Sequence, residues 1–148
     1  MKIVDANVLL YAMNEDAPQH AAARLWLETA LSGSETVGFA WVVLLAFLRL
    51  STRPAVFTRP LLPEESLGLI EAWLGQPCAT IVHPGDRHLR ILKDLVERLG
   101  TGGNLTSDAH LAALALEHGA DLCSCDADFS RFPGLRWRNP LASPLVRK

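Results

Sequence analysis

Carboxylate side chains stand at the places in this sequence where a shared site is expected. Asp5 follows the first predicted strand, and Asp126 and Asp128 follow the fourth. Ligands of open α/β sheets collect outside the carboxyl ends of the strands, so these three acids mark a candidate site. Asp108 lies in the first turn of the helix that precedes the fourth strand. It joins the site only if that helix begins at the same edge of the sheet, which the spacing leaves open.

Carboxylates gathered in this way predict metal chemistry. They repel one another, and either a shared proton or a divalent cation relieves the repulsion. A site made only of oxygen ligands selects Mg²⁺ or Mn²⁺, ions that use few carboxylates alongside water and substrate phosphate. Such an ion polarises a phosphoryl oxygen and lowers the pKa of a bound water. The pattern therefore favours hydrolysis of phosphodiesters without a Ser, Cys or His nucleophile.

Each acid also has a purely structural explanation. Asp108 near a helix start would stabilise the helix dipole by about 0.3 to 1 kcal/mol. Asp126 and Asp128 suit a turn, and Asp5 suits a helix cap. The structural explanation is weakest for Asp5, because an unpaired carboxylate at the end of a central strand is costly to bury. Asn7 would either orient the Asp5 carboxylate or a water, or cap a helix itself.

The elements that must position these side chains alternate between strands and helices. Helical spacing of apolar residues, capping residues and Gly or Pro stops define the helices, and short apolar runs define the strands. The region after Asp5 shifts toward helical spacing, and the nearly all-apolar helix after the second strand is expected to be buried on most sides. Strands are predicted over 2–4, 36–39, 79–82, 121–124 and 135–137, and helices over 16–32, 41–51, 63–75, 84–100 and 106–119, the last capped by Thr106 or Ser107.

This alternation predicts an α/β fold of three layers, a mostly parallel sheet of four to five strands flanked by helices. We expect one domain over residues 1–148, because that length suits a single core and neither a repeat nor a linker interrupts it.

Composition narrows the class of protein. The chain has 14 Lys and Arg against 16 Asp and Glu, so any contact with nucleic acid must be local. Its longest apolar run, residues 39–48, is shorter than the roughly 17 to 25 residues of a membrane helix. No secretory signal follows Met1, so a cytoplasmic location and no membrane partner are expected. Three cysteines do not suggest a disulfide framework.

A local basic patch would provide the contact with nucleic acid. Arg49 and Arg53 follow the apolar helix, and with Arg59 they are candidates to bind the phosphates of an RNA backbone. A solvated helix end explains the same residues without any ligand, and we slightly favour that explanation.

Three segments carry a resemblance to a known family. They read MKIVDANVLLYA at 1–12, LTSDAHLAALA at 105–115, and CDADF at 125–129 with FPGL at 132–135. In this order and at these distances they resemble the PIN-domain proteins of the VapC toxin family over nearly the whole chain. The resemblance implies a Mg²⁺-dependent ribonuclease, the toxin of a type II toxin–antitoxin pair, with its acids together at one end of a parallel sheet.

The resemblance also implies roles for single residues and partners. Asp5, Asp108 and Asp126 are expected to be catalytic, with Asp5 and Asp108 as ligands of Mg²⁺, for which Mn²⁺ substitutes, and with Asn7 and Asp128 in support. The expected partners are an RNA substrate, a cognate VapB-type antitoxin and a second copy of the chain in a homodimer.

One departure from the family pattern keeps other functions open. The family places a Glu in the helix after the second strand, but residues 36–63 contain no acid, and Ala46 stands where that Glu is expected. A catalytically weak PIN-like module that binds RNA or a partner is therefore one alternative. A haloacid-dehalogenase-like phosphatase is another, although it needs a second acid where this chain has Asn7.

Overall fold

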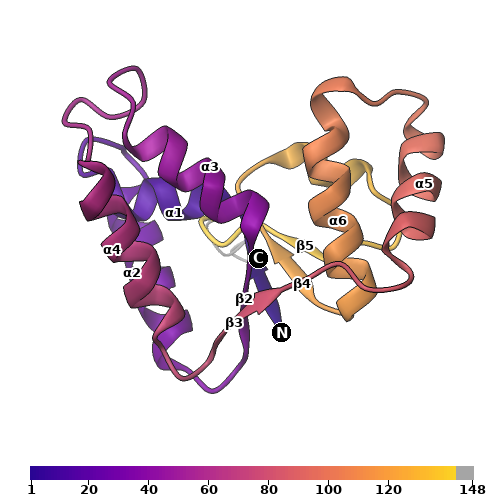
Figure 1. Cartoon of the computed structure of the whole chain (residues 1–148), viewed down its shortest axis with the longest axis horizontal. Coiled ribbons are helices and arrows are strands. Elements are labelled where there is room, and N and C mark those ends of the chain that lie inside the picture. The colour runs from indigo at the N-terminus through magenta and orange to yellow at the C-terminus, as the bar shows by residue number, and fades with distance from the viewer. Residues whose placement is uncertain (143–148) are drawn as a thin grey trace, which may run out of the picture.

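A parallel sheet of five strands forms the centre of the molecule (Figure 1). The computed structural model describes residues 1–142. The strands lie in the order β3-β2-β1-β4-β5, and each neighbouring pair is parallel. Their bounds are β1 Lys2–Val4, β2 Val37–Ala40, β3 Ala79–Val82, β4 Asp121–Cys123 and β5 Trp137–Arg138. The predicted α/β fold with a mostly parallel sheet of four to five strands is confirmed.

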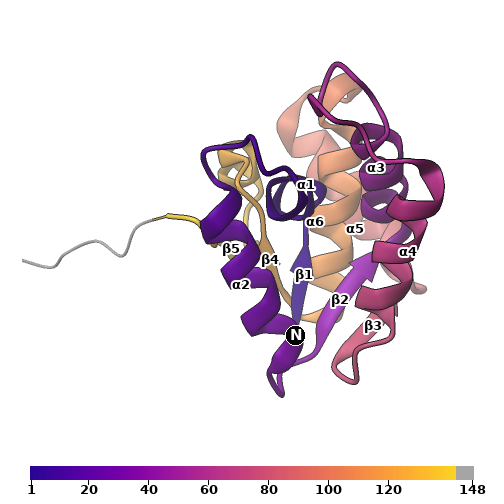
Figure 2. The same cartoon turned by 90° about the vertical axis from the view of Figure 1, so that its left-hand side faces the viewer.

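Helices cover both faces of this sheet, as Figures 1 and 2 show from two directions. α1, α2, α3 and α4 lie on one face, while α5 and α6 lie on the other. Their bounds are α1 Ala6–Met13, α2 His20–Ser32, α3 Trp41–Ser51, α4 Pro63–Leu74, α5 His88–Leu99 and α6 Thr106–His118. Two 3₁₀ helices, η1 Gly103–Leu105 and η2 Ala127–Arg131, complete the connections. Within residues 1–142, none of the helices has the length and apolar character needed to cross a membrane.

The strand order explains why the helices divide in this way. From β1 to β2 and on to β3 the chain moves outward in one direction, and from β3 it jumps back across β2 and β1 to β4. Crossovers between parallel strands are almost always right-handed. The crossover from β3 to β4 runs across the sheet in the opposite direction to the two before it. A right-handed connection therefore places its helices, α5 and α6, on the face of the sheet opposite to the other helices.

The returning crossover also settles where α6 begins. It holds two antiparallel helices, of which α5 runs along the strand direction and α6 runs back (Figure 1). Glu117, near the end of α6, accepts hydrogen bonds from the backbone N–H groups of Gly85 (2.6 Å) and Arg87 (2.9 Å), so the segment before α5 lies at the amino edge of the sheet. The first turn of α6, with Asp108, consequently lies at the carboxyl edge.

α3 is less buried than its composition predicts. Its inner face packs Phe47 edge-on against Trp73 of α4, with ring centroids 4.8 Å apart, and Phe39 of β2 stacks on the same indole. Its outer face leaves Trp41 49% and Leu45 56% exposed. The expectation that α3 is buried on most sides is therefore wrong, because only a stripe of an amphipathic surface helix meets the core.

Two helix starts and one helix cap differ from the predicted ones. α2 begins at His20 rather than residue 16, because the preceding residues form a turn in which Asn14 accepts a hydrogen bond from the Asp16 N–H. α5 begins at His88, since Glu117 holds the backbone before it. α6 begins at Thr106 and continues directly from η1, with Leu105 in the cap position, so the cap predicted at Thr106 or Ser107 is wrong.

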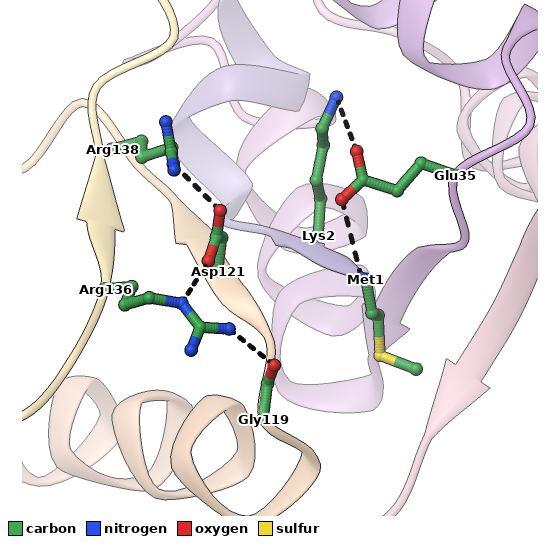
Figure 3. A network of polar contacts seen from close by, with 7 residues as sticks. All are labelled: Met1, Lys2, Glu35, Gly119, Asp121, Arg136 and Arg138. Atoms are coloured by element: carbon green, nitrogen blue, oxygen red, sulfur yellow. Dashed lines mark hydrogen bonds and ion pairs between the residues drawn. The ribbon is translucent and has the colours of Figure 1, made fainter.

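Ion pairs fasten the amino edge of the sheet, opposite the edge where the strands end (Figure 3). At the start of β4, Asp121 accepts hydrogen bonds from Arg136 Nε at 2.6 Å and Arg138 Nε at 2.8 Å, which tie β5 to β4. Glu35 pairs with Lys2 Nζ at 3.2 Å and with the N-terminal amine. The two guanidinium groups lower the pKa of Asp121.

Candidate active site

Asp5 is fixed at the carboxyl end of β1 by the register of the sheet. Val4 pairs with Cys123, so Asp5 stands beside Ser124 at the end of β4, and its N–H donates to the Cys123 carbonyl at 2.9 Å. Asp5 caps α1, with Oδ1 accepting from the Ala6 N–H at 2.7 Å. Its Oδ2 accepts from Ser124 Oγ at 2.6 Å. Because both oxygens accept hydrogen bonds from the protein, the Asp5 carboxylate is held in one orientation.

Ser124 is a functional residue that the sequence analysis missed. Its side chain is fully buried, and its Oγ also accepts from the Asp126 N–H at 3.0 Å. One hydroxyl therefore connects the two acids that follow β1 and β4. Its place two residues before Asp126 is the signal in the sequence, but it becomes informative only once the register of β1 and β4 is known.

Asn7 joins the ends of the same two strands. Its Nδ2 donates to Ser124 Oγ at 3.2 Å and to Asp5 Oδ2 at 3.4 Å, and its Oδ1 accepts from the Cys125 N–H at 3.2 Å. All these bonds stay within the protein, so the amide orients the Asp5 carboxylate and the start of the loop after β4.

Asp108, Asp126 and Asp128 converge on one point beside Asp5. One carboxylate oxygen from each of the three lies within 4.8 Å of the others. Asp126 caps η2 by accepting from the Asp128 N–H at 2.9 Å, which turns both side chains toward the start of α6. Asp108 and Asp126 are half-buried and Asp128 is exposed. The fold thus gathers three of the four acids that the sequence singled out into one group, and Asp5 lies beside this group on the wall of the same cavity as Asp108.

Burial and mutual repulsion shift the acids toward the protonated form. Burial is the main cause that raises the pKa of Asp5, against the hydrogen bonds from Ser124 and Ala6. Burial, followed by the charges of Asp126, Asp5 and Asp128, raises the pKa of Asp108 to about 6. Four carboxylates in such a place fit a hard divalent cation, because it favours the ionised form of all of them at once. The residues present therefore suit Mg²⁺ or Mn²⁺.

A cavity of about 320 Å³ opens beside the acids, between α3 and α6. Asp5 and Asp108 form part of its wall, and Ala46 and Arg49 line it from α3. The position where the resemblance leads us to expect a Glu therefore faces the site, and this chain presents the methyl group of Ala46 there. Arg53 is exposed beyond the end of α3 and is not among the residues that line this cavity.

The raised pKa values predict how pH affects the protein without metal. Between about 3.9, the pKa of an unfolded Asp, and about 6, the folded state holds more protons at Asp108 than the unfolded state does. The free energy of unfolding should therefore fall as pH rises through this window. Adding Mg²⁺ should raise the melting temperature more at about pH 7.5 than at about pH 5, because the cation needs ionised carboxylates.

Thermal melts with and without Mg²⁺ at both pH values check this prediction. In Asp108→Asn the difference between the two pH values should shrink. If Mg²⁺ raises the melting temperature equally at both pH values, Asp108 and its neighbouring acids do not bind the cation in their ionised form.

Comparisons with known proteins agree with this geometry. The sequence profile described as "PIN domain" matches residues 2–135. The chain is 53% identical over 142 residues, 96% of its own length and 99% of the other, to a protein named Ribonuclease VapC37 of Mycobacterium tuberculosis. Among solved structures, VapBC2 from Rickettsia felis, bound to a promoter DNA fragment, aligns with a TM-score of 0.68 at 18% identity, covering 93% of this chain and 97% of that one. VapC20 of M. tuberculosis, described as a toxin that cleaves the sarcin–ricin loop, aligns with a TM-score of 0.64 at 17% identity, covering 88% and 93%.

Proposed function

The chain belongs to the PIN-domain family and, within it, to the VapC ribonucleases, and we propose on this basis that it is the endoribonuclease toxin of a type II toxin–antitoxin pair. The observation that carries the proposal is the convergence of Asp108, Asp126 and Asp128 within 4.8 Å beside Asp5. An acidic site at the carboxyl edge of a parallel sheet suits metal-assisted hydrolysis of a phosphodiester.

In this proposal Asp5, Asp108 and Asp126 are the catalytic acids. Asp5 and Asp108 hold the cation, and a bound Mg²⁺ would polarise the scissile phosphate and lower the pKa of a water. Ser124 and Asn7 hold the Asp5 carboxylate in one orientation. Their hydrogen bonds remain entirely within the protein, so both act as positioning residues.

Arg49 is proposed to attract the RNA backbone. It is the cationic residue among those that line the cavity beside Asp5 and Asp108, so a phosphate bound near the acids meets a compensating charge. Arg53, exposed beyond the end of α3, is proposed to contact a more distant phosphate.

The direct test is an assay on total RNA with the purified chain. Cleavage is expected with Mg²⁺ or Mn²⁺ and is expected to stop when EDTA is added, since the acids alone offer no nucleophile. Restoring Mg²⁺ after EDTA should recover the activity, which separates loss of the ion from loss of the fold. Cleavage that continues unchanged in EDTA would contradict a metal-dependent site.

Asp126 is expected to contribute more than Asp128 to the same site. Asp126 is half-buried, is tied to Ser124 through its own N–H and caps η2, whereas Asp128 is exposed. Asp126→Asn should therefore weaken Mn²⁺ affinity about tenfold or more, and Asp128→Asn less. Mn²⁺ titrations of the two variants check this ranking, and equal or reversed effects would refute it.

The partners follow from the same family membership. We propose an RNA substrate, a VapB-type antitoxin that inhibits the site, and a homodimer, all in the cytoplasm. Solved relatives of the same fold include a VapBC complex, which supports an antitoxin partner.

A second function is favoured by one observation. Ala46 lines the cavity where the family pattern has a Glu, which leaves the cation one possible ligand fewer. A catalytically weak module that binds RNA or a partner would fit that loss. Binding of RNA without cleavage in either Mg²⁺ or Mn²⁺ would identify that function.

A further inference from the structure

A second cavity, of about 510 Å³, lies over β1, β4 and β5 on the face of the sheet that α2 borders. In the sheet Lys2 pairs with Asp121, and Cys123 pairs with Arg138, so these four side chains leave their strands on the same face. The other residues of the wall are Trp26 of α2, Glu35, Asn139 and Pro140. Within residues 1–142, none of the four acids at the carboxyl edge lines this cavity, so it is a separate candidate site.

Positive charge exceeds negative charge at this cavity (Figure 3). Asp121 accepts hydrogen bonds from both Arg136 Nε and Arg138 Nε. Glu35 pairs with Lys2 Nζ at 3.2 Å, so even without the N-terminal amine three cations face two carboxylates. The side chain of Arg138 is 69% exposed, and a guanidinium has further N–H donors beyond the Nε that Asp121 binds. An anionic group can therefore bind to Arg138 and Lys2 without separating their ion pairs.

An aromatic side chain stands beside these cations. Lys2 Nζ lies over the indole of Trp26, 5.9 Å from the ring centroid. One ribose is long enough to connect a phosphate bound at Lys2 with a base packed against that indole. A bare anion would leave Trp26 and Pro140 without a partner, and a purely apolar ligand would leave the cations without one.

We propose that this cavity binds a nucleotide, with the phosphate at Lys2 and Arg138 and the base at Trp26. Its volume lies within the range of about 300 to 1,000 Å³ found for small-ligand sites. A free mononucleotide and the terminal nucleotide of an RNA strand share this chemistry. The inference goes beyond the proposed ribonuclease, because binding here needs neither the acids nor a divalent cation.

The test measures binding of GMP by calorimetry in EDTA, so that no cation links the phosphate to the acidic site. Lys2→Met removes the charge and keeps the aliphatic stem, while Trp26→Leu removes the ring and keeps apolar volume. Lys93→Met on the exposed surface of α5 is the matched control for the lost charge. Guanosine and inorganic phosphate are the control ligands, and thermal melts establish that each variant is folded.

GMP should bind the wild type with a Kd below about 1 mM. Lys2→Met should weaken binding about tenfold, the scale of one hydrogen bond to a charged group. Trp26→Leu should weaken it about tenfold or more, the scale of one stacked base. Guanosine and phosphate should each bind more weakly than GMP, because each keeps only part of the contacts. Lys93→Met and Asp108→Asn should bind GMP like the wild type.

A uridine octamer with a 5′ phosphate distinguishes the two sources of the nucleotide. If the octamer displaces GMP from the wild type and binds Lys2→Met more weakly, the cavity holds the end of an RNA strand. If the octamer does not displace GMP, the ligand is a free nucleotide.

Four results would overturn the inference. One is the absence of saturable GMP binding below about 1 mM. Another is binding of inorganic phosphate as tight as that of GMP, which would identify a simple anion site. Equal GMP affinity in the wild type, Lys2→Met and Trp26→Leu would place the nucleotide elsewhere, and loss of binding in Asp108→Asn would place it at the acids. These measurements need no RNA cleavage, so their failure leaves the proposed function standing.

Discussion

Replacing Asp108 by Asn is expected to lower RNA cleavage by about 10³-fold, because several kcal/mol of charge stabilisation depends on a cation that this carboxylate holds. The fold should survive the change. Asp108 is destabilised by burial and by three neighbouring acids, which raise its pKa to about 6. In the metal-free protein at about pH 7.5, Asn should therefore leave the melting temperature unchanged or raise it.

This pairing of lost activity with retained stability separates a functional acid from a structural one. Asp94→Asn on α5 is the matched control, since within residues 1–142 Asp94 pairs only with Arg98 on the exposed surface, and it should keep full activity. Asp5→Asn should also abolish cleavage, with a cap still formed at α1 because Asn is a good cap residue. If Asp5→Asn or Asp108→Asn cleaves RNA at the wild-type rate, the residue replaced in that variant does not hold the cation.

The sheet and most of the helices followed from local patterns in the sequence. Short apolar runs bounded by Gly, Pro and polar residues marked the strands, and the alternation with helices required a parallel sheet. Asp5 was recognisable as a site residue because it directly follows β1. Its position depends on only a few neighbouring residues, so spacing was sufficient to predict it.

The position of Asp108 depended on information that spacing does not contain. Whether α6 starts at the carboxyl edge depends on how the segment after β3 returns to the amino edge, where Glu117 holds it. Ser124 was missed for a similar reason, since its role appears only when β1 and β4 are in register. Both are long-range relations between parts of the chain that a local pattern cannot reveal.

The exposed face of α3 supplies the last prediction. A groove of about 500 Å³ runs between α3 and α4, lined by aliphatic residues that include Leu45, Leu48 and Leu67. Leu62 and Leu67 are 62% and 51% exposed beside it. Apolar surface gathered in this way marks a site for a protein partner. Arg49 lines both this groove and the cavity of the acids, so a partner in the groove lies next to the site.

Leu67→Asp is therefore expected to free the enzyme from its antitoxin. A charge in the apolar groove should weaken binding of the antitoxin about 30-fold or more, the scale of one central interface residue. Cleavage of RNA without antitoxin should stay at the wild-type rate, because Leu67 does not line the cavity of the acids. The candidate antitoxin for this test is the product of the adjacent upstream reading frame, purified together with the chain, and the readout is ribonuclease activity with and without it.

Leu89→Asp is the matched control, because Leu89 is 75% exposed on α5, on the opposite face of the sheet. This variant should bind the antitoxin and be inhibited like the wild type. The groove could bind the antitoxin or join two copies of the chain, and the oligomeric state of each protein distinguishes these two uses. If Leu67→Asp separates a homodimer into monomers and the antitoxin still inhibits it fully, the groove joins two copies of the chain. If the wild-type complex with the antitoxin remains fully active, the partner does not cover the acids, and inhibition through this surface is refuted.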